Sequence, residues 1–202
     1  MNKKQLLIAA IAAALSVSGV DASNITGITQ SGNTFNITPE QINGSVGYRK
    51  YTDFTLDNGH IANLIYYGTK NSTGRNLEAF VNLVQNHVNI QGILNTVDQS
   101  GNFSNGHAIF ITPSGLTVGS NGVLNVGALS VATPTTETYN NLVEDYRFGN
   151  FDNINQISKL KQDSNANINI NGIVVARRGV DLRGASVNVA GKILNGVNNN
   201  QT

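Results

Sequence analysis

Short apolar runs alternate with turn-forming residues along the middle of the chain, most clearly in residues 106–134. There the apolar positions fall two or three at a time, and Gly, Pro, Ser or Asn fills each gap. Alternation over a few residues predicts a β-strand, and the gaps predict turns. A new strand begins about every seven residues, which leaves too little chain for helical crossovers. The pattern therefore favours strands that form successive sides of a coiled β-solenoid.

A weak sequence repeat points the same way. A β-branched residue or Leu, then Asn, then a second β-branched residue, any residue and usually Gly recur in copies that begin at Val88, Leu124, Ile168 and Val187. Because side chains alternate between strand faces, the apolar pair should point inward and Asn outward. The starts lie 36, 44 and 19 residues apart, which fits coils of about 18 to 22 residues. The predicted fold class is all-β, a right-handed parallel β-helix.

Residues 23–74 are turn-rich and contain strand candidates at residues 34–38, 48–56 and 61–67. A solenoid needs its first coil covered, because an open end exposes apolar core and unpaired strand edges. This segment is therefore predicted to be an N-terminal cap, and residues 75–134 to be the first coils. An alternative is that its aromatic residues line a ligand groove. They are Tyr48, Tyr51, Phe54, Tyr66 and Tyr67.

Residues 135–164 change from a period of two to helical spacing. Apolar or aromatic side chains recur at i, i+3, i+4 and i+7 from Tyr139 to Tyr146, and Gly149 is a plausible helix stop. Ile154, Ile157 and Leu160 predict a second short helix. The segment is interpreted as a helical insertion on the side of the solenoid, and residues 165–202 as further coils. Its acidic residues are interpreted as a solvent-exposed face.

The N-terminus has the features of an export signal. A basic start is followed by an apolar run from Leu6 to Val20 and by small residues around Ala22. Fifteen apolar residues are short for a membrane span of roughly 20, so residues 1–22 are predicted to be a cleaved secretory signal. The alternative is a buried Ala-rich helix. Cleavage of the signal would leave residues 23–202 as one mature domain.

Charge and cysteine content narrow the function further. Removal of residues 1–22 leaves eleven basic and eleven acidic residues, scattered along the chain. Such a chain has no electrostatic footprint for nucleic acid or for an anionic membrane surface. The chain also contains no Cys, and therefore no disulfide framework. One hypothesis is that disulfides would obstruct passage of an unfolded chain through a second membrane.

No catalytic, metal or cofactor site is predicted. His60, His87 and His107 are far apart and lack Cys partners, so no metal-ligand spacing is recognisable. Some β-helices are polysaccharide lyases or hydrolases, and glycoside hydrolysis needs two carboxyl groups about 5–10 Å apart. The acidic residues form no organised cluster in the sequence. We therefore expect a protein that is not an enzyme and has no small-molecule substrate, with a carbohydrate-active β-helix as an alternative.

The order of segments before and after one turn is distinctive. The early stretch YRKYTDFTLDNGHIANLIYYG is followed by NLEAFVNLVQNHVNIQGIL and then by the strand AIFI. That strand leads into a turn made of Thr112, Pro113, Ser114 and Gly115. Residues 116–119, 126–129 and 132–133 follow it. This order resembles the N-terminal secretion domain of two-partner secretion exoproteins, the filamentous-haemagglutinin-like adhesins and their relatives.

The resemblance implies a partner and a place for recognition. Members of this family are recognised in an extended state by the periplasmic domains of a dedicated outer-membrane pore protein, and they belong to filamentous adhesins. The resemblance therefore implies a secreted or cell-surface protein, exported across the inner and outer membranes of a diderm bacterium. The family turn is Asn-Pro-Asn-Gly, so Thr112 and Ser114 replace amides, although a type I turn is still satisfied. A second family motif, Asn-Pro-Asn-Leu, has a faint counterpart in Arg75, Asn76 and Leu77. An alternative function is an adhesin module that itself binds a host or neighbouring cell surface.

Overall fold

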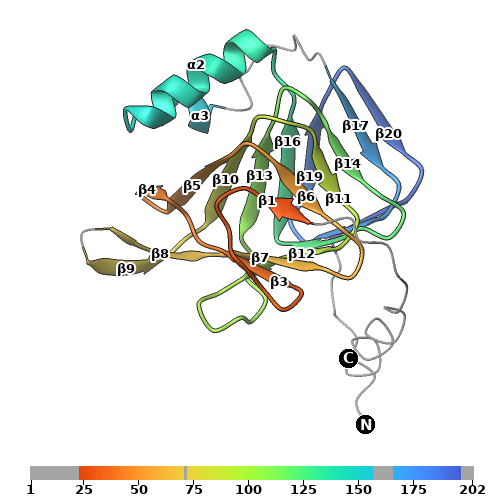
Figure 1. The fold of residues 1–202 in the computed structure, drawn as a ribbon, viewed down its shortest axis with the longest axis horizontal. Coiled ribbons are helices and arrows are strands. Elements are labelled where there is room, and N and C mark those ends of the chain that lie inside the picture. The colour runs from red at the N-terminus through yellow and green to blue at the C-terminus, as the bar shows by residue number, and fades with distance from the viewer. Residues whose placement is uncertain (1–22, 71, 157–165, 197–202) are drawn as a thin grey trace.

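The computed structural model describes residues 23–70, 72–156 and 166–196, and most of them lie in β-strands (Figure 1). The strands form three large sheets and one separate hairpin. In spatial order, sheet A contains β1 (Asn24–Ile25), β6 (Phe54–Leu56), β11 (Val88–Ile90), β14 (Leu116–Val118), β17 (Asn167–Ile170) and β20 (Ser186–Val189). Sheet B contains β2 (Gln30–Ser31), β3 (Thr34–Ile37), β7 (Ile61–Ile65), β12 (Ile93–Val97), β15 (Val123–Val126), β18 (Ile173–Ala176) and β21 (Lys192–Asn195). Sheet C contains β4 (Gln41–Asn43), β5 (Val46–Tyr51), β10 (Ala79–Val84), β13 (His107–Ile111), β16 (Ala128–Ala132) and β19 (Val180–Arg183). The hairpin consists of β8 (Tyr67–Lys70) and β9 (Thr73–Asn76).

The chain visits the three sheets in a fixed rotation. From β10 onward, each set of three consecutive strands contributes one strand to sheet C, one to sheet A and one to sheet B, and we call such a set a round. Equivalent strands of successive rounds pair in parallel, as β10 does with β13 and β13 with β16. The three sheets share one apolar core on their inner faces, and buried residues from every sheet contribute to it.

The repeat predicted from the sequence spans two sheets. The copies at Val88, Ile168 and Val187 share sheet A, where their paired positions also include Leu116. The copy at Leu124 belongs to sheet B and pairs with Leu94 and Val174. Positions paired down sheet A are 28, 52 and 19 residues apart, so the expectation of a constant coil of about 20 residues was wrong. Loops and helices inserted between strands change the spacing without disturbing the register.

Inward and outward faces follow the predicted alternation. In β11 and β17 the two apolar residues of the repeat are buried and the central Asn is partly exposed. Outward Asn side chains of neighbouring strands bond to one another, as Asn63 does to Asn36 at 3.0 Å and Asn188 to Asn169 at 3.1 Å. Such amide ladders reinforce the register of parallel strands. Val187 and Val189 are exposed because β20 is the edge strand of sheet A in the described residues.

The N-terminal segment contributes both to the sheets and to their edges. The strand predicted over residues 48–56 is two strands, β5 and β6, which belong to different sheets. Together with β7 they form the first round, paired in parallel with β10, β11 and β12. The edges at this end are occupied by β1 and β4, which pair antiparallel with β6 and β5, and by β2, which pairs antiparallel with β3. The predicted cap, residues 23–74, thus includes β5, β6 and β7, which belong to the first round. The segment that lies outside the rounds at this end is therefore shorter than predicted.

Of the five aromatic residues that the sequence singles out in this segment, four are buried and Tyr67 is partly exposed. Tyr48, Tyr51, Phe54 and Tyr66 are at most 2% exposed, and the rings of Tyr51 and Phe54 meet edge to face at 5.4 Å. The ligand-groove alternative therefore has no accessible aromatic surface among these four residues.

Two helices occupy the segment where the sequence changes period. Helix α2 (Thr136–Arg147) begins at Thr135, whose side chain accepts a hydrogen bond from the Thr138 amide, and Gly149 with φ of 70° follows its end. Helix α3 (Asp152–Asn155) follows it and buries Ile154. Ile157 and Leu160, predicted to continue this helix, lie outside the described residues, as do residues 1–22.

The helices cover the outer face of sheet C. Side chains of α2 and α3 join outward-facing sheet residues in a second apolar cluster, separate from the inner core, and Figure 1 shows α2 lying outside the sheets. The cluster comprises Tyr48, Val81, Leu83, Ile111, Tyr139, Leu142, Tyr146, Phe151 and Ile154. In the described parts of the chain, no helix is long and apolar enough to cross a membrane.

We expect Phe110→Ala to lower the free energy of unfolding by about 3–5 kcal/mol, because it removes a large buried ring from the core. Phe110 is fully buried and packs edge to face on Phe54 at 5.4 Å. Phe148→Ala is the matched control, since Phe148 is 75% exposed, and its effect should stay within about 0.5 kcal/mol. Denaturant unfolding of both variants measures the difference, and equal effects would contradict the assigned core.

Candidate functional site

The turn Thr112–Gly115 joins β13 of sheet C to β14 of sheet A. Thr112 is fully buried and its amide donates to the Ala132 carbonyl at 3.0 Å, which ties the turn to the next round. The Ser114 amide donates to Thr112 Oγ1 at 3.2 Å. A threonine hydroxyl therefore closes this turn in the way that the oxygen of an asparagine side chain closes an Asx-turn. The change from Asn to Thr keeps the acceptor and gives up the amide donors.

The turn is also bonded to the corner of the preceding round, residues 85–87. Thr112 Oγ1 donates to the Asn86 carbonyl at 3.1 Å, and Ser114 Oγ donates to the Gln85 carbonyl at 3.0 Å. The ring of His87 lies 2.8 Å from the Ser114 carbonyl through Nδ1 and 2.9 Å from Thr117 Oγ1 through Nε2. Several polar groups of the turn are thus bonded within the fold, while Ser114 is exposed and Pro113 is partly exposed.

Gly115 is required by both its conformation and its surroundings. Its φ of 87° lies in the left-handed region, and a Cβ atom there would lie 2.5 Å from the Asn167 carbonyl oxygen. The main chain of the following round therefore passes too closely for any side chain.

The weaker candidate motif lies elsewhere. Arg75 and Asn76 belong to β9, where Asn76 pairs with Tyr67, and Arg75 donates to the Gly44 carbonyl at 3.3 Å. Leu77 is buried, and its amide donates to the Tyr66 carbonyl at 3.0 Å. This motif precedes β10, whereas Thr112 lies beside Asn86, which follows β10. The structure therefore holds the two motifs at opposite ends of β10, about 20 Å apart for a six-residue strand, and does not combine them into one site.

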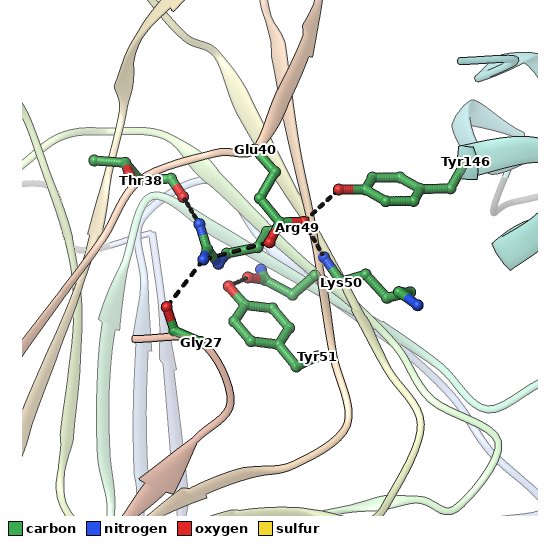
Figure 2. Close-up of polar contacts among 8 residues, drawn as sticks. Gly27, Thr38, Glu40, Arg49, Lys50, Tyr51 and Tyr146 are labelled. Carbon is green, nitrogen blue, oxygen red and sulfur yellow. Dashed lines mark hydrogen bonds and ion pairs between the residues drawn. The ribbon is translucent and has the colours of Figure 1, made fainter. Parts of the chain in front are cut away.

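A polar cluster that the sequence did not predict lies at the N-terminal edge of sheet C, and we call it the edge cluster: Glu40, Arg49, Tyr51, Asn82 and Tyr146. Figure 2 shows the Arg49 guanidinium between Glu40 and the carbonyls of Thr38 and Gly27. The Arg49–Glu40 ion pair measures 3.3 Å, and the Arg49 side chain is only 13% exposed. A largely buried charge is stabilised only when such partners surround it.

The remaining members of the edge cluster come from strands β5 and β10 and from helix α2. Tyr51 donates to Asn82 Oδ1 at 2.9 Å inside the core, while the Asn82 amide group donates to the Ile109 carbonyl at 3.1 Å. Tyr146 of α2 donates to Glu40 Oε2. Burial raises the pKa of Tyr51 well above its usual value, and burial together with Glu40 raises the pKa of Tyr146. Both hydroxyl groups therefore stay protonated, and able to donate a hydrogen bond, well above neutral pH.

One signal in the sequence could have revealed Arg49. It stands two residues before Tyr51, so in a strand both side chains lie on the same face. An arginine on the inner face of a strand predicts partners that come from outside the strand.

The histidines form no shared site. His60 Nδ1 lies 2.9 Å from Ser23 Oγ, His87 contacts the Thr112–Gly115 turn, and His107 Nε2 lies 2.8 Å from Ser130 Oγ. Within residues 23–70, 72–156 and 166–196 no group of three His, Asp or Glu residues has the arrangement of a metal site.

Two of the carboxylates considered for the enzyme alternative have local partners. Asp98 accepts bonds from the amides of Asn102 and Ser100, which lower its pKa. Asp181 pairs with Arg183 at 2.8 Å.

Comparison with known proteins gives no relative: no protein-family model and no curated protein matches this chain.

Gly115→Ala should destabilise the protein more than Gly44→Ala, by about 1–3 kcal/mol, because only the first substitution forces a Cβ atom against a carbonyl oxygen. Both glycines have positive φ, so the conformational penalty common to Ala at both sites cancels in the comparison. Thermal or denaturant unfolding of the two variants measures this. Equal destabilisation would mean that the turn is not in close contact with residue 167.

Stability should fall as pH decreases below about 6.5, the usual pKa of histidine. Burial and the nearby Arg178 lower the pKa of His107, and Asp181 only partly opposes them. The folded state then binds fewer protons than the unfolded state at mildly acidic pH, so acid favours unfolding. Unfolding free energies of the wild type and of His107→Gln at pH 7 and pH 5 test this, and the variant should have the shallower dependence. An unchanged slope would exclude a contribution from His107.

Proposed function

We propose that residues 23–202 form a right-handed parallel β-helix that serves as the targeting domain of a two-partner secretion exoprotein. The observation that carries the proposal is the rotation of the chain through three parallel sheets around one core, which permits folding one round at a time from the N-terminal end. Parallel strands joined by a crossover are nearly always right-handed, which supports that handedness for the rounds.

Recognition would precede folding. The strand partners of β1 and β4 belong to the first round, so these two strands are unpaired until that round forms, whereas β2 pairs with β3. All three strands are only two or three residues long. A partner can bind such a segment by strand addition, in which main-chain hydrogen bonds supply affinity and alternate side chains supply selectivity. The partner in this proposal is an outer-membrane pore protein, which would act through its periplasmic domains.

The internal bonds of the Thr112–Gly115 turn are compatible with the same order of events. Thr112 has no exposed surface, and Ser114, although exposed, is bonded to Gln85 and His87. The proposal assigns recognition of this turn to the unfolded chain, where these bonds are absent, and gives the turn the role of a corner between sheets after export. Each completed round then buries apolar side chains on the round before it, which favours outward movement of the chain.

The proposed location follows from the proposed route. Residues 1–22 would direct the chain across the inner membrane, and the mature domain would be secreted or remain at the cell surface as part of a filamentous adhesin. Direct adhesion by this domain is the alternative, with an exposed aromatic patch or the helical insertion as the contact surface. Tyr48, Tyr51, Phe54 and Tyr66 are buried, whereas Phe148, which follows α2, is 75% exposed.

We expect deletion of residues 23–74, or the double change Pro113→Ala and Gly115→Ala, to abolish appearance of the protein in the medium when it is co-expressed with its pore protein. The deletion removes the first strands available for strand addition, and the double change disturbs the proposed turn motif. Normal release of either variant would sink the proposal.

A destabilised fold also reduces release, so the turn variant needs a matched control. Phe110→Ala weakens the core without touching the turn and should be released better than the turn variant at equal unfolding free energy. Binding of the urea-unfolded mature chain to the isolated periplasmic domains of the pore protein gives a second measurement. If uncharged groups of the turn form a hydrogen bond with the periplasmic domains, the turn variant should bind them at least about tenfold more weakly than Phe110→Ala does.

A further inference from the structure

We propose that helices α2 and α3 act as a latch that fixes the N-terminal edge of sheet C only after residues 136–155 have folded. The consequence for export rests on the proposed function, whereas the latch itself rests on contacts within this chain. Strand β4, the edge strand of sheet C, is three residues long and is bonded on one side only, to β5. A strand of this length pairs weakly without further support.

The first set of latch contacts joins α2 to the residues around β4. Tyr146, in the last turn of α2, donates its hydroxyl hydrogen to Glu40 Oε2, and Figure 2 shows its ring directed toward that carboxylate. Gln41, the first residue of β4, donates from Nε2 to the Tyr146 carbonyl at 3.1 Å. One helix residue therefore contacts both the residue before β4 and the first residue within it.

The second set joins α3 to β5. The rings of Tyr48 and Phe151 are stacked with centroids 4.1 Å apart, and the Tyr48 hydroxyl donates to Asn155 Oδ1 at 2.6 Å. The Tyr48 carbonyl in turn accepts the Glu40 amide at 2.9 Å. Each strand of the β4–β5 pair is thus bonded to a residue more than one hundred positions further along the chain, β4 to Tyr146 and β5 to Asn155.

Glu40 connects helix α2 to the N-terminal segment through its carboxylate. Its carboxylate accepts the Lys50 amide at 3.3 Å and pairs with Arg49, which donates to the carbonyls of Thr38 and Gly27. The hydroxyl of Tyr146 therefore orients a carboxylate on which the position of Arg49 depends. Through Arg49, the same contact holds the segments that follow β1 and β3 against the first round.

The helices lie late in the chain, whereas the sheet edge that they stabilise lies early. Residues 23–70 leave the pore first, but the contacts that close their edge come from residues 146–155. Until those residues emerge, β4 is weakly held and the edge of β5 remains open to a partner strand. Folding of the helices favours β4 over that partner, so release of the N-terminal segment is coupled to export of the helical insertion.

The matched pair Tyr146→Phe and Tyr139→Phe isolates the latch. Both tyrosines are buried on the same face of α2, but the Tyr139 hydroxyl has no hydrogen-bond partner, so its loss removes no contact. In the folded mature chain we expect Tyr146→Phe to accelerate amide hydrogen exchange in residues 40–50 by about tenfold, the effect of losing one bond to a charged group. Tyr139→Phe should leave those rates unchanged, and exchange in β13 should be unchanged in both variants.

If Tyr146→Phe does not fold, Tyr48→Phe serves as the second variant, because it keeps the ring stack on Phe151 and removes only the bond to Asn155. Acceleration in residues 40–50 equal to that in β13, or the same in Tyr139→Phe, would overturn the latch. A release assay with the pore protein's periplasmic domains then tests the consequence: Tyr146→Phe should leave them more slowly. Faster exchange with unchanged release would retain the latch and reject its role in export, whereas no binding of any variant would reject the proposed function alone.

Discussion

Main-chain hydrogen bonding between parallel strands of successive rounds is the interaction on which the rest of the structure depends. It fixes each strand in register with the one before it, so that inward apolar residues stack on apolar residues and outward Asn residues stack on Asn, as in the bond between Asn188 and Asn169 at 3.1 Å. Because the register is local to each pair, insertions between strands are tolerated. The helical insertion lengthens one step down sheet A to 52 residues and leaves the pairing of Leu116 with Ile168 intact.

Side chains must make this stacking possible at two places, the corners between sheets and the first edge of the sheets. Corners need residues that close a turn and let the next round pass closely, and the Thr112–Gly115 turn does so with a hydroxyl acceptor and a glycine at positive φ. The first edge needs a cover for its polar main chain and for the inner face of the first round. There Arg49 binds carbonyls of the covering segment, and Glu40 neutralises its charge. Hydrogen-bonding groups therefore close this end of the molecule together with buried apolar side chains of the covering strands, among them Ile25, Phe35 and Ile42.

The helical insertion connects these two demands. It packs on the outer face of sheet C, where the outward residues Val81, Leu83 and Ile111 are apolar and require a cover. Its far end also bonds to Glu40 and Gln41 at the first edge. A segment that interrupts the repeat thus supplies both a second apolar cluster and the contacts that fix the strand at the edge.

The sequence by itself determined the strand-forming character of the chain, the inward and outward alternation of residues such as Val88 and Asn89, and the helix from Tyr139 to Tyr146. These follow from local periodicity, which depends on backbone geometry alone. Tertiary structure decided which strand belongs to which sheet, and so placed Leu124 in sheet B and the other repeat copies in sheet A. It also brought Tyr146 to Glu40 and separated Arg75 from Thr112. Such long-range placements depend on loop lengths and on packing between segments, which no local pattern records.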